Sequence, residues 1–435
     1  MKKVTRKEKR KKEENVNFFE EFIKIQKHFF SSLVERLKRV KDPRHQSYIE
    51  YGPEILIFSM IMKNICAIPS MRNMTEKFNK DECIENVRTV LGYETLEELP
   101  HYDTINNYLR NLETAQLEKL RDYMIGELFR KRSLEKFRLL DKYWCIAVDG
   151  TGLFSFTERH CEHCLKKEYK NKETGEVERT VYYHHVLEAK LVAGNMVFSI
   201  ATEFIENEDE NVDKQDCEIN AFKRLQVKLK NKYPRLPICL LGDSLYACEP
   251  VFEICEKNNW KYLFRFKEGR IKSVAKEFEI LKEMDAEKEN GCTWINDIGY
   301  NSRCVNLIEA EIETDKGMKE FVFITDIRIT KRNFNEIVCF GRSRWKIENQ
   351  GFNNQKTKKY KIEHVNCMDY NAMQNHYLIT QIADILRQLF DEGLTIIKDL
   401  KKGIKEISSV LLESFRTSIL TNTEDIQKRI QIRFT

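Results

Sequence analysis

The chain has 435 residues, of which 41% are hydrophobic and 33% are charged, and this balance is that of a soluble globular protein. The length predicts two or three domains. The net charge is only +5, so the total charge does not indicate nucleic-acid binding. Evidence for such binding must come from local clusters of basic residues.

Cysteine usage and the apolar segments argue against a secreted or membrane protein. The 13 cysteines are scattered and odd in number, whereas a disulfide framework is typical of short secreted chains. The start of the chain lacks the apolar core of a signal peptide. The best membrane candidate, residues 54–68, is too short and is interrupted by Lys63 and Asn64. We therefore expect reduced thiols, no membrane contact and a cytoplasmic location.

The first part of the chain is predicted to be helical after a basic tail. Residues 1–15 are rich in Lys and Arg and are predicted to be disordered. Residues 16–140 show apolar residues at helical spacing, and prolines divide the region into short helices. Residues 99–112 indicate a helix with a polar face and Asp103 as its N-cap. This helix is either the recognition helix of a DNA-binding domain or an ordinary surface helix.

The periodicity changes near residue 142, where strand-like segments begin. Residues 142–156 predict a buried strand that breaks at Gly150 and Gly152. Two further strands, at residues 181–193 and 196–204, are predicted on either side of a Gly-Asn turn. The elements that follow are predicted as helix, strand, helix and strand, at residues 216–233, 235–244, 249–260 and 261–267.

The remaining third of the chain is predicted to change from strand to helix. Residues 270–335 contain short β-like runs without a strong helical pattern, so we expect a mostly β segment there. Helical spacing resumes at residues 342–360 and in an apolar helix at residues 370–390. The tail, residues 393–435, is predicted to be helical and mildly basic.

Three acidic residues occupy positions from which a metal site could be built. Asp149 and Asp243 each end a predicted buried strand, and adjacent parallel strands would bring both carboxylates to one end of a sheet. Glu348 lies on a predicted helix. Each acid alone is more often a strand-end or helix-surface residue. Together, in this order, they favour a site for two Mg²⁺ ions, which take oxygen ligands and assist phosphodiester chemistry.

These residues give the chain its resemblance to a known family. It resembles bacterial insertion-sequence transposases of the DDE type, whose catalytic domain is RNase H-like. In that family the first Asp lies on the first strand, the second Asp just after the fourth strand, and the Glu on a later helix. The matching residues are Asp149 in AVDGTG, Asp243 in LLGDSLYA and Glu348 in RWKIEN.

One subgroup of this family has a mostly β insertion before the Glu and a Tyr-Arg-Glu-Lys signature around it. Arg344 and Glu348 have the four-residue spacing of the signature. Gly341 stands where the signature has Tyr, and Gln355 stands where it has Lys, with Lys356 one place later. The match to the signature is therefore partial.

The resemblance implies a mixed α/β fold with several domains. An all-helical DNA-binding domain is expected at residues 16–140. An RNase H-like catalytic domain is expected at residues 141–392, with a mostly β insertion at about 270–335, followed by the helical tail at residues 393–435.

The resemblance also implies a function. The expected enzyme binds the ends of an insertion sequence and performs Mg²⁺-dependent DNA strand cleavage and strand transfer. Asp149, Asp243 and Glu348 would be both catalytic residues and ligands of two Mg²⁺ or Mn²⁺ ions. The expected partners are double-stranded transposon ends and target DNA, bound by a dimer. The expected location is the bacterial cytoplasm, where the DNA-bound protein would be associated with the nucleoid.

Five residues are expected to contact DNA, namely Arg344, Trp345, Lys356, Lys358 and Lys359. A lysine cluster is usually only a solvated face. Because this cluster follows a proposed metal-binding Glu in the sequence, we favour a role for it in binding DNA phosphate. Trp345 could stack on a displaced base, although a tryptophan at this helical position is more often part of the core.

Two other functions remain open. The alternative is a catalytically inactive or domesticated transposase that acts as a DNA-binding protein, and the departures at Gly341 and Gln355 leave room for it. The intact acids and Arg344 favour the active enzyme. A stand-alone RNase H-like nuclease would share the chemistry but would not need a module that binds DNA ends.

Two clusters invite a metal-site interpretation. Cys161 and Cys164 in RHCEHC have the spacing of half a Zn²⁺ site, and His184 or His185 could approach through the fold. An exposed loop after the first strand is favoured over Zn²⁺ binding there. The acidic run that ends at Glu218 is predicted to be a solvated loop leading into a helix N-terminus.

Overall fold

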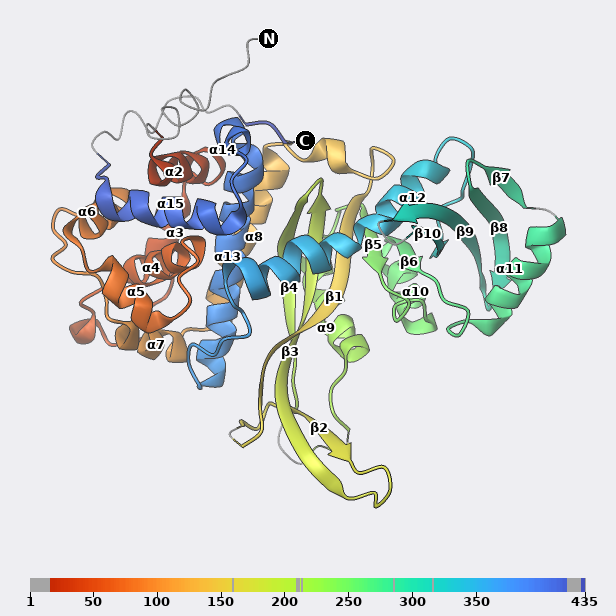
Figure 1. Cartoon of the computed structure of the whole chain (residues 1–435), viewed down its shortest axis with the longest axis horizontal. Helices are drawn as coiled ribbons and strands as arrows, with labels where there is room; N and C mark the ends of the chain where they lie inside the picture. Colours follow the sequence, from red (N-terminus) through yellow and green to blue (C-terminus); the bar gives the residue numbers. More distant parts are fainter. Residues whose placement is uncertain are drawn as a thin grey trace, which may run out of the picture. The chain divides into compact units, whose positions relative to one another are not determined.

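The computed structural model describes residues 16–158, 160–208, 212, 214–284, 286–314, 317–420 and 432–434, and the tail predicted at residues 1–15 lies outside them. The chain forms two compact units (Figure 1). The helical unit consists of residues up to Ser133, Leu153–His163 and residues from Phe352 onward. The sheet unit consists of Leu134–Gly152 and Cys164–Gly351.

The helical unit is built from both ends of the chain. Its N-terminal elements are α2 (Phe18–Phe29), α3 (Leu33–Lys38), η1 (Gln46–Tyr48), α4 (Pro53–Ile65), α5 (Met71–Phe78), α6 (Asp81–Leu91), α7 (Tyr102–Asn111) and α8 (Thr114–Arg130). Its C-terminal elements are the π-helix η4 (Asn354–Lys359), α13 (Tyr370–Gly393), α14 (Thr395–Leu400) and α15 (Ile404–Thr417).

Helix α13 is the centre of this unit. It packs against α4, α7 and α8. Because of these contacts α13, which was expected within the catalytic domain, belongs to the same compact unit as the N-terminal helices. Every residue of α4 is buried, so the apolar segment that was judged too short to cross a membrane is a core helix. Among the described residues, no helix combines the length and apolar character needed to span a membrane. In α7 the N-cap is His101, so the prediction of Asp103 as the cap is wrong.

The sheet unit contains the strands and the helices that connect them. The strands are β1 (Trp144–Phe156, whose last residues belong to the helical unit), β2 (Leu165–Lys170), β3 (Val177–Ala193), β4 (Met196–Ile205), β5 (Ile238–Gly242), β6 (Lys261–Arg265), β7 (Glu287–Glu289), β8 (Cys292–Tyr300), β9 (Arg303–Thr314) and β10 (Gly317–Thr325). The helices are η2 (Glu135–Phe137), α9 (Glu218–Lys232), α10 (Glu249–Asn258), α11 (Lys272–Met284), α12 (Phe334–Ser343) and the π-helix η3 (Ile347–Phe352).

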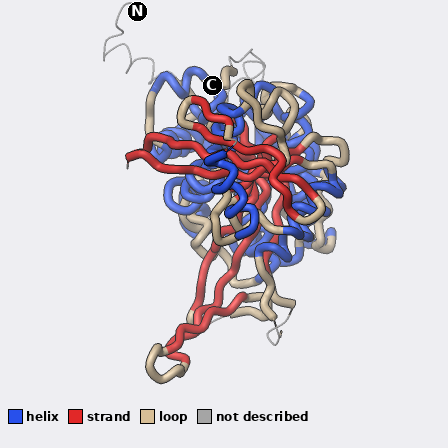
Figure 2. Tube along the Cα trace, turned by 90° about the vertical axis from the view of Figure 1, so that its right-hand side faces the viewer, coloured by secondary structure: helices blue, strands red, loops and turns tan. Residues whose placement is uncertain are grey.

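These strands form one mixed sheet, and this confirms the coarse prediction of a mixed α/β protein. The order is β2-β3-β1-β5-β6-β10-β9-β8-β7, with β4 also paired to β3. Strands β1, β5 and β6 are parallel neighbours, whereas β10, β9 and β8 continue the sheet in antiparallel fashion. The strands that descend in Figure 2 include the β2–β3 hairpin. The strand predicted at residues 181–193 forms most of β3, whereas β2 and the start of β3 lie where a loop was expected.

The segment expected to be mostly β contains the four strands β7–β10, as predicted, but it begins with a helix that was not predicted. This helix is α11, whose residues Val274 and Phe278 are buried and which packs against β8. Strand β1 does not break at Gly150 and Gly152 but continues to Phe156. All 13 cysteines lie among the described residues and are free thiols, as expected.

Candidate metal centre at the end of strand β5

The parallel pairing of β1 and β5 brings two of the predicted acids to the same level. Trp144 lies opposite Ile238, and the register continues unchanged to Ala147 opposite Leu241. The same offset puts Asp149 level with Asp243, directly after β5 ends. Asp149 does not end its strand, as predicted, but lies within β1 at the point where its neighbour stops. The Asp149 side chain is largely buried, and its Oδ2 has Arg344 as an ion partner there.

Arg344 connects the third acid to this pair. Its Nη1 lies 3.2 Å from Oδ2 of Asp149 and 3.3 Å from Oε1 of Glu348. The Arg344 side chain is only 9% exposed, and that of Glu348, in the wide π-helical turn of η3, is 43% exposed. Arg344, expected to contact DNA, is therefore directed at the two carboxylates in this structure.

Glu218, the first residue of α9, is a fourth carboxylate here that sequence reasoning missed. Its Oε1 accepts a hydrogen bond of 2.6 Å from the hydroxyl of Tyr246. A Cβ atom built on Gly150 would lie 2.9 Å from Oε2 of Glu218, so the glycine after Asp149 allows this close approach. The position of Glu218 at a helix N-terminus was predicted correctly, but the acidic run before it suggested only a solvated loop.

The electrostatics of the centre reflect crowded, partly buried carboxylates. Burial, together with the charges of Glu348, Glu218 and Asp243, raises the pKa of Asp149 to about 7, against the lowering effect of Arg344. Burial also raises the pKa of Glu218, as does the charge of Asp243. A single guanidinium therefore leaves negative charge that a bound cation would neutralise.

The donor set suits hard divalent cations. Carboxylate oxygens are the preferred ligands of Mg²⁺ and Mn²⁺. Asp149, Asp243 and Glu348 are not drawn together in this structure as closely as the ligands of a single ion are. Two ions about 4 Å apart would have to bring them together as shared ligands.

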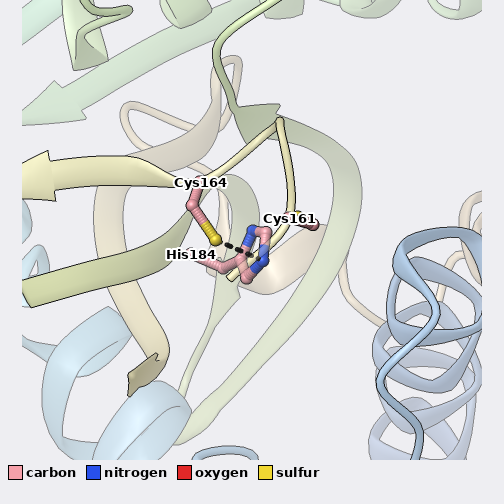
Figure 3. Close-up of side chains that lie close together, drawn as sticks. All are labelled: Cys161, Cys164 and His184. Carbon is pink, nitrogen blue, oxygen red and sulfur yellow. Dashed lines mark hydrogen bonds between the residues drawn. The ribbon is translucent and has the colours of Figure 1, made fainter. Parts of the chain in front are cut away.

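A sulfur and nitrogen group, Cys164 and His184, lies near the start of β2 (Figure 3). Sγ of Cys164 lies 3.2 Å from Nε2 of His184, and both residues are buried, so the prediction of an exposed loop is wrong for Cys164. His185 points to the other face, as neighbours in a strand must, and lies beside Gly150. A structural Zn²⁺ ion takes four ligands, and within the sheet unit Cys164 and His184 offer two.

Trp345 lies on the surface and not in the core. It is 50% exposed and lines a cavity of about 720 Å³ within the sheet unit. Three basic residues, Lys319, Arg342 and Lys346, line the same cavity. Lys346 donates a hydrogen bond of 2.6 Å to the backbone oxygen of Gly194. An exposed indole among cations is a surface on which a nucleobase and its phosphate can bind.

The lysines predicted to follow the Glu belong to the helical unit and differ from one another. Lys356 forms an ion pair of 2.9 Å with Glu363. Lys359 is buried, with its Nζ 3.3 Å from Oδ2 of Asp391. Lys358 is exposed. Of the three, Lys358 is the most available to a phosphate.

The departures from the Tyr-Arg-Glu-Lys signature have structural reasons. A Cβ atom built on Gly341 would lie 2.8 Å from the ring of Phe323, so α12 packs against β10 too closely for a larger residue. Gln355 is fully buried and donates hydrogen bonds to Gln381 and Asp384. Gln355 therefore contributes to the core of the helical unit.

Comparison of the chain with protein-family models found no matching family, and comparison with curated proteins found no match. What the centre itself offers is a set of carboxylates at the end of a strand, with one guanidinium between two of them. Such a set can hold hard divalent cations next to an anionic substrate.

Proposed function

We propose that this chain is a DDE-type transposase that cleaves and joins DNA with the help of two divalent metal ions. The observation that carries the proposal is the convergence of carboxylates at the end of β5. Asp149 stands level with Asp243, and Arg344 joins Asp149 to Glu348. The mixed sheet, with these acids at the end of parallel strands, supports an RNase H-like catalytic domain.

The roles of the residues follow from their contacts. Asp149, Asp243 and Glu348 would hold two Mg²⁺ or Mn²⁺ ions, which when bound activate the attacking oxygen and stabilise the leaving oxygen of a phosphodiester. Glu218, oriented by the hydroxyl of Tyr246, adds a fourth carboxylate. A positioned carboxylate that touches no metal still orients the groups around it and the water between them.

Arg344 is proposed to keep the carboxylates in place until substrate binds. Because its Nη1 is shared between Asp149 and Glu348, it limits their repulsion and holds η3 against β1. When the ions neutralise both acids, the guanidinium is free to bind a DNA phosphate, for which its planar fork is suited. This order of events accounts both for the ion pairs of Arg344 and for the DNA contact that the signature leads us to expect.

The substrate is proposed to be double-stranded DNA, first the ends of the element and then the target, bound by a dimer. The cavity lined by Trp345, Arg342, Lys319 and Lys346 offers an aromatic face and three positive charges in the same unit as the acids. Stacking and charge together bind nucleic acid with little dependence on sequence.

The test is a cleavage and strand-transfer assay on DNA that carries the element's own ends. We expect nicking in Mg²⁺ or Mn²⁺ and none in EDTA. Asp149→Ala, Asp243→Ala and Glu348→Ala should each reduce cleavage roughly a thousandfold or more, because metal assistance is worth several kcal/mol. DNA binding should largely survive.

Asp297→Ala is the matched control, since Asp297 is an exposed acid of the same unit whose ion partner is Arg328. It should cut at the parent rate. Cleavage by Asp149→Ala at the parent rate would refute the proposed centre. Binding of the ends by the parent without cutting in any divalent ion would instead favour the catalytically inactive DNA-binding protein.

A further inference from the structure

A second strongly basic feature lies wholly within the helical unit. A cavity of about 220 Å³ is lined by five lysines, namely Lys77, Lys358, Lys359, Lys361 and Lys405. They come from α5, from η4 and the residues after it, and from α15. We call this feature the lysine cavity. None of the proposed metal ligands takes part in it.

Four of the five lysines have charges that other described residues leave uncompensated. Lys359 lies 3.3 Å from Asp391 and 3.8 Å from Asp384, which accounts for its burial. Among the described residues, no carboxylate forms an ion pair with Lys77, Lys358, Lys361 or Lys405, in contrast to neighbouring Lys356 and Lys402. Like charges that gather in one cavity repel one another, so their arrangement favours an anion.

The walls of the cavity also supply neutral hydrogen-bond donors. Thr357, Ser408 and Ser409 line it together with the lysines. Ser409 and Lys405 are four residues apart on α15 and therefore lie on the same helix face. Ser408 is buried, and its hydroxyl accepts a hydrogen bond from Arg387 and donates one to the backbone oxygen of Ile404. Ser409 is exposed, so its hydroxyl is accessible to a ligand, whereas the Thr357 hydroxyl already donates to the backbone oxygen of Asn353.

The backbone around the cavity is held in a specific shape. Lys361 has a φ of 51°, in the left-handed region that residues other than glycine rarely adopt. Two backbone hydrogen bonds on either side of Lys361 hold this conformation. The carbonyl oxygen of Gln355 accepts both, from the N–H groups of Tyr360 and Ile362.

We propose that the lysine cavity binds the phosphate backbone of DNA and is a second DNA-binding site, in addition to the metal centre. Lysines are flexible point charges, which suits phosphates whose exact position varies. A backbone that presents successive phosphates can engage lysines from three elements at once, whereas a single small anion would satisfy only some of them. The choice of DNA as the phosphate-bearing ligand rests on the proposed function.

The test is binding of a short random-sequence DNA duplex in EDTA, measured by fluorescence anisotropy over a series of NaCl concentrations. The variant is Lys358→Gln/Lys405→Gln, which changes two exposed lysines and should fold normally. We expect its affinity to fall roughly tenfold and the slope of log K against log salt to fall by about one per lost phosphate contact. The control Lys41→Gln/Lys119→Gln removes two exposed lysines that do not line the cavity and should bind like the parent.

The outcomes separate this inference from the proposed function. An unchanged affinity and salt slope for Lys358→Gln/Lys405→Gln overturns the inference, even if cleavage is normal. Loss of binding in that variant supports it, even if no divalent ion allows the parent to cut. If inorganic phosphate stabilises the parent but not the variant against heat, while both bind the duplex equally, the cavity takes a small anion and the DNA assignment is wrong.

Discussion

Asp149 and Asp243 stand at the same level of two adjacent parallel strands, although three strands and a helix separate them along the chain. The backbone register of β1 and β5 sets this relationship, so it does not depend on flexible loops. Because the register brings the two negative charges near each other, the centre carries an electrostatic cost in the absence of cations. Arg344 offsets part of that cost, whereas the burial of Asp149 adds to it and raises the pKa of this carboxyl.

The role of Arg344 predicts a stability defect that metal reverses. Arg344→Gln should lower the free energy of unfolding in EDTA by about 3 kcal/mol, since it leaves two partly buried carboxylates without their cation. Mg²⁺ should restore more stability in this variant than in the parent. Arg342→Gln, two residues earlier and exposed, should change stability by less than about 0.5 kcal/mol. Urea unfolding with and without Mg²⁺ measures both, and an equal effect of Mg²⁺ on parent and variant would contradict the role.

Glu218 predicts a defect in metal affinity without loss of the fold. Glu218→Gln should weaken Mn²⁺ binding by about 10- to 100-fold, as expected for a group that orients or supplements metal ligands. Tyr246→Phe, which removes only the hydrogen bond to Glu218, should have a smaller effect of the same sign. Glu253→Gln on α10 is an exposed control. Calorimetric titration with Mn²⁺ tests this, and parental affinity in Glu218→Gln would exclude Glu218 from the centre.

The raised pKa of Asp149 predicts how stability changes with pH in EDTA. The folded protein keeps this carboxyl protonated up to a pKa of about 7, whereas the unfolded chain loses the proton near pH 3.8. The folded state therefore binds more protons in that window, and this group lowers the free energy of unfolding as the pH rises through it. Asp149→Asn should gain stability relative to the parent between these pH values. Thermal melts across the range should reveal a widening difference, and a constant difference would contradict the assignment.

The close packing at Gly341 predicts that restoring the family signature would harm this chain. Gly341→Tyr should destabilise the protein by about 1–3 kcal/mol or more, because even a Cβ atom meets the ring of Phe323. It should not increase cleavage. Gly269→Ala has open space around its Cβ position and should be nearly neutral. Denaturant unfolding provides the measurement, and a stable Gly341→Tyr variant with faster cleavage would show that the signature tyrosine can be accommodated.

Much of the local structure could be predicted from the sequence, because helices and strands leave a periodic pattern in a single segment. The strand ending at Gly242, the turn after β3 and the helix beginning at Glu218 all lie where the pattern placed them. Helix α11 was missed because its short apolar face, with Val274 and Phe278, lies among strand-like runs. The two aspartates were found because a charged residue at the end of an apolar strand is conspicuous. Glu348 was found through the resemblance of RWKIEN to the family signature.

The sequence by itself determined the elements, the identity of Asp149, Asp243 and Glu348 as candidates, and the coarse α/β class. Only the tertiary structure decided which distant residues meet. The approach of Glu218 to Gly150, the ion pair of Arg344 with Asp149 and the lysine cavity each join segments that no local pattern relates. The physical reason is that periodicity encodes which face of an element is buried, whereas proximity between elements depends on strand register and on the packing of many side chains at once.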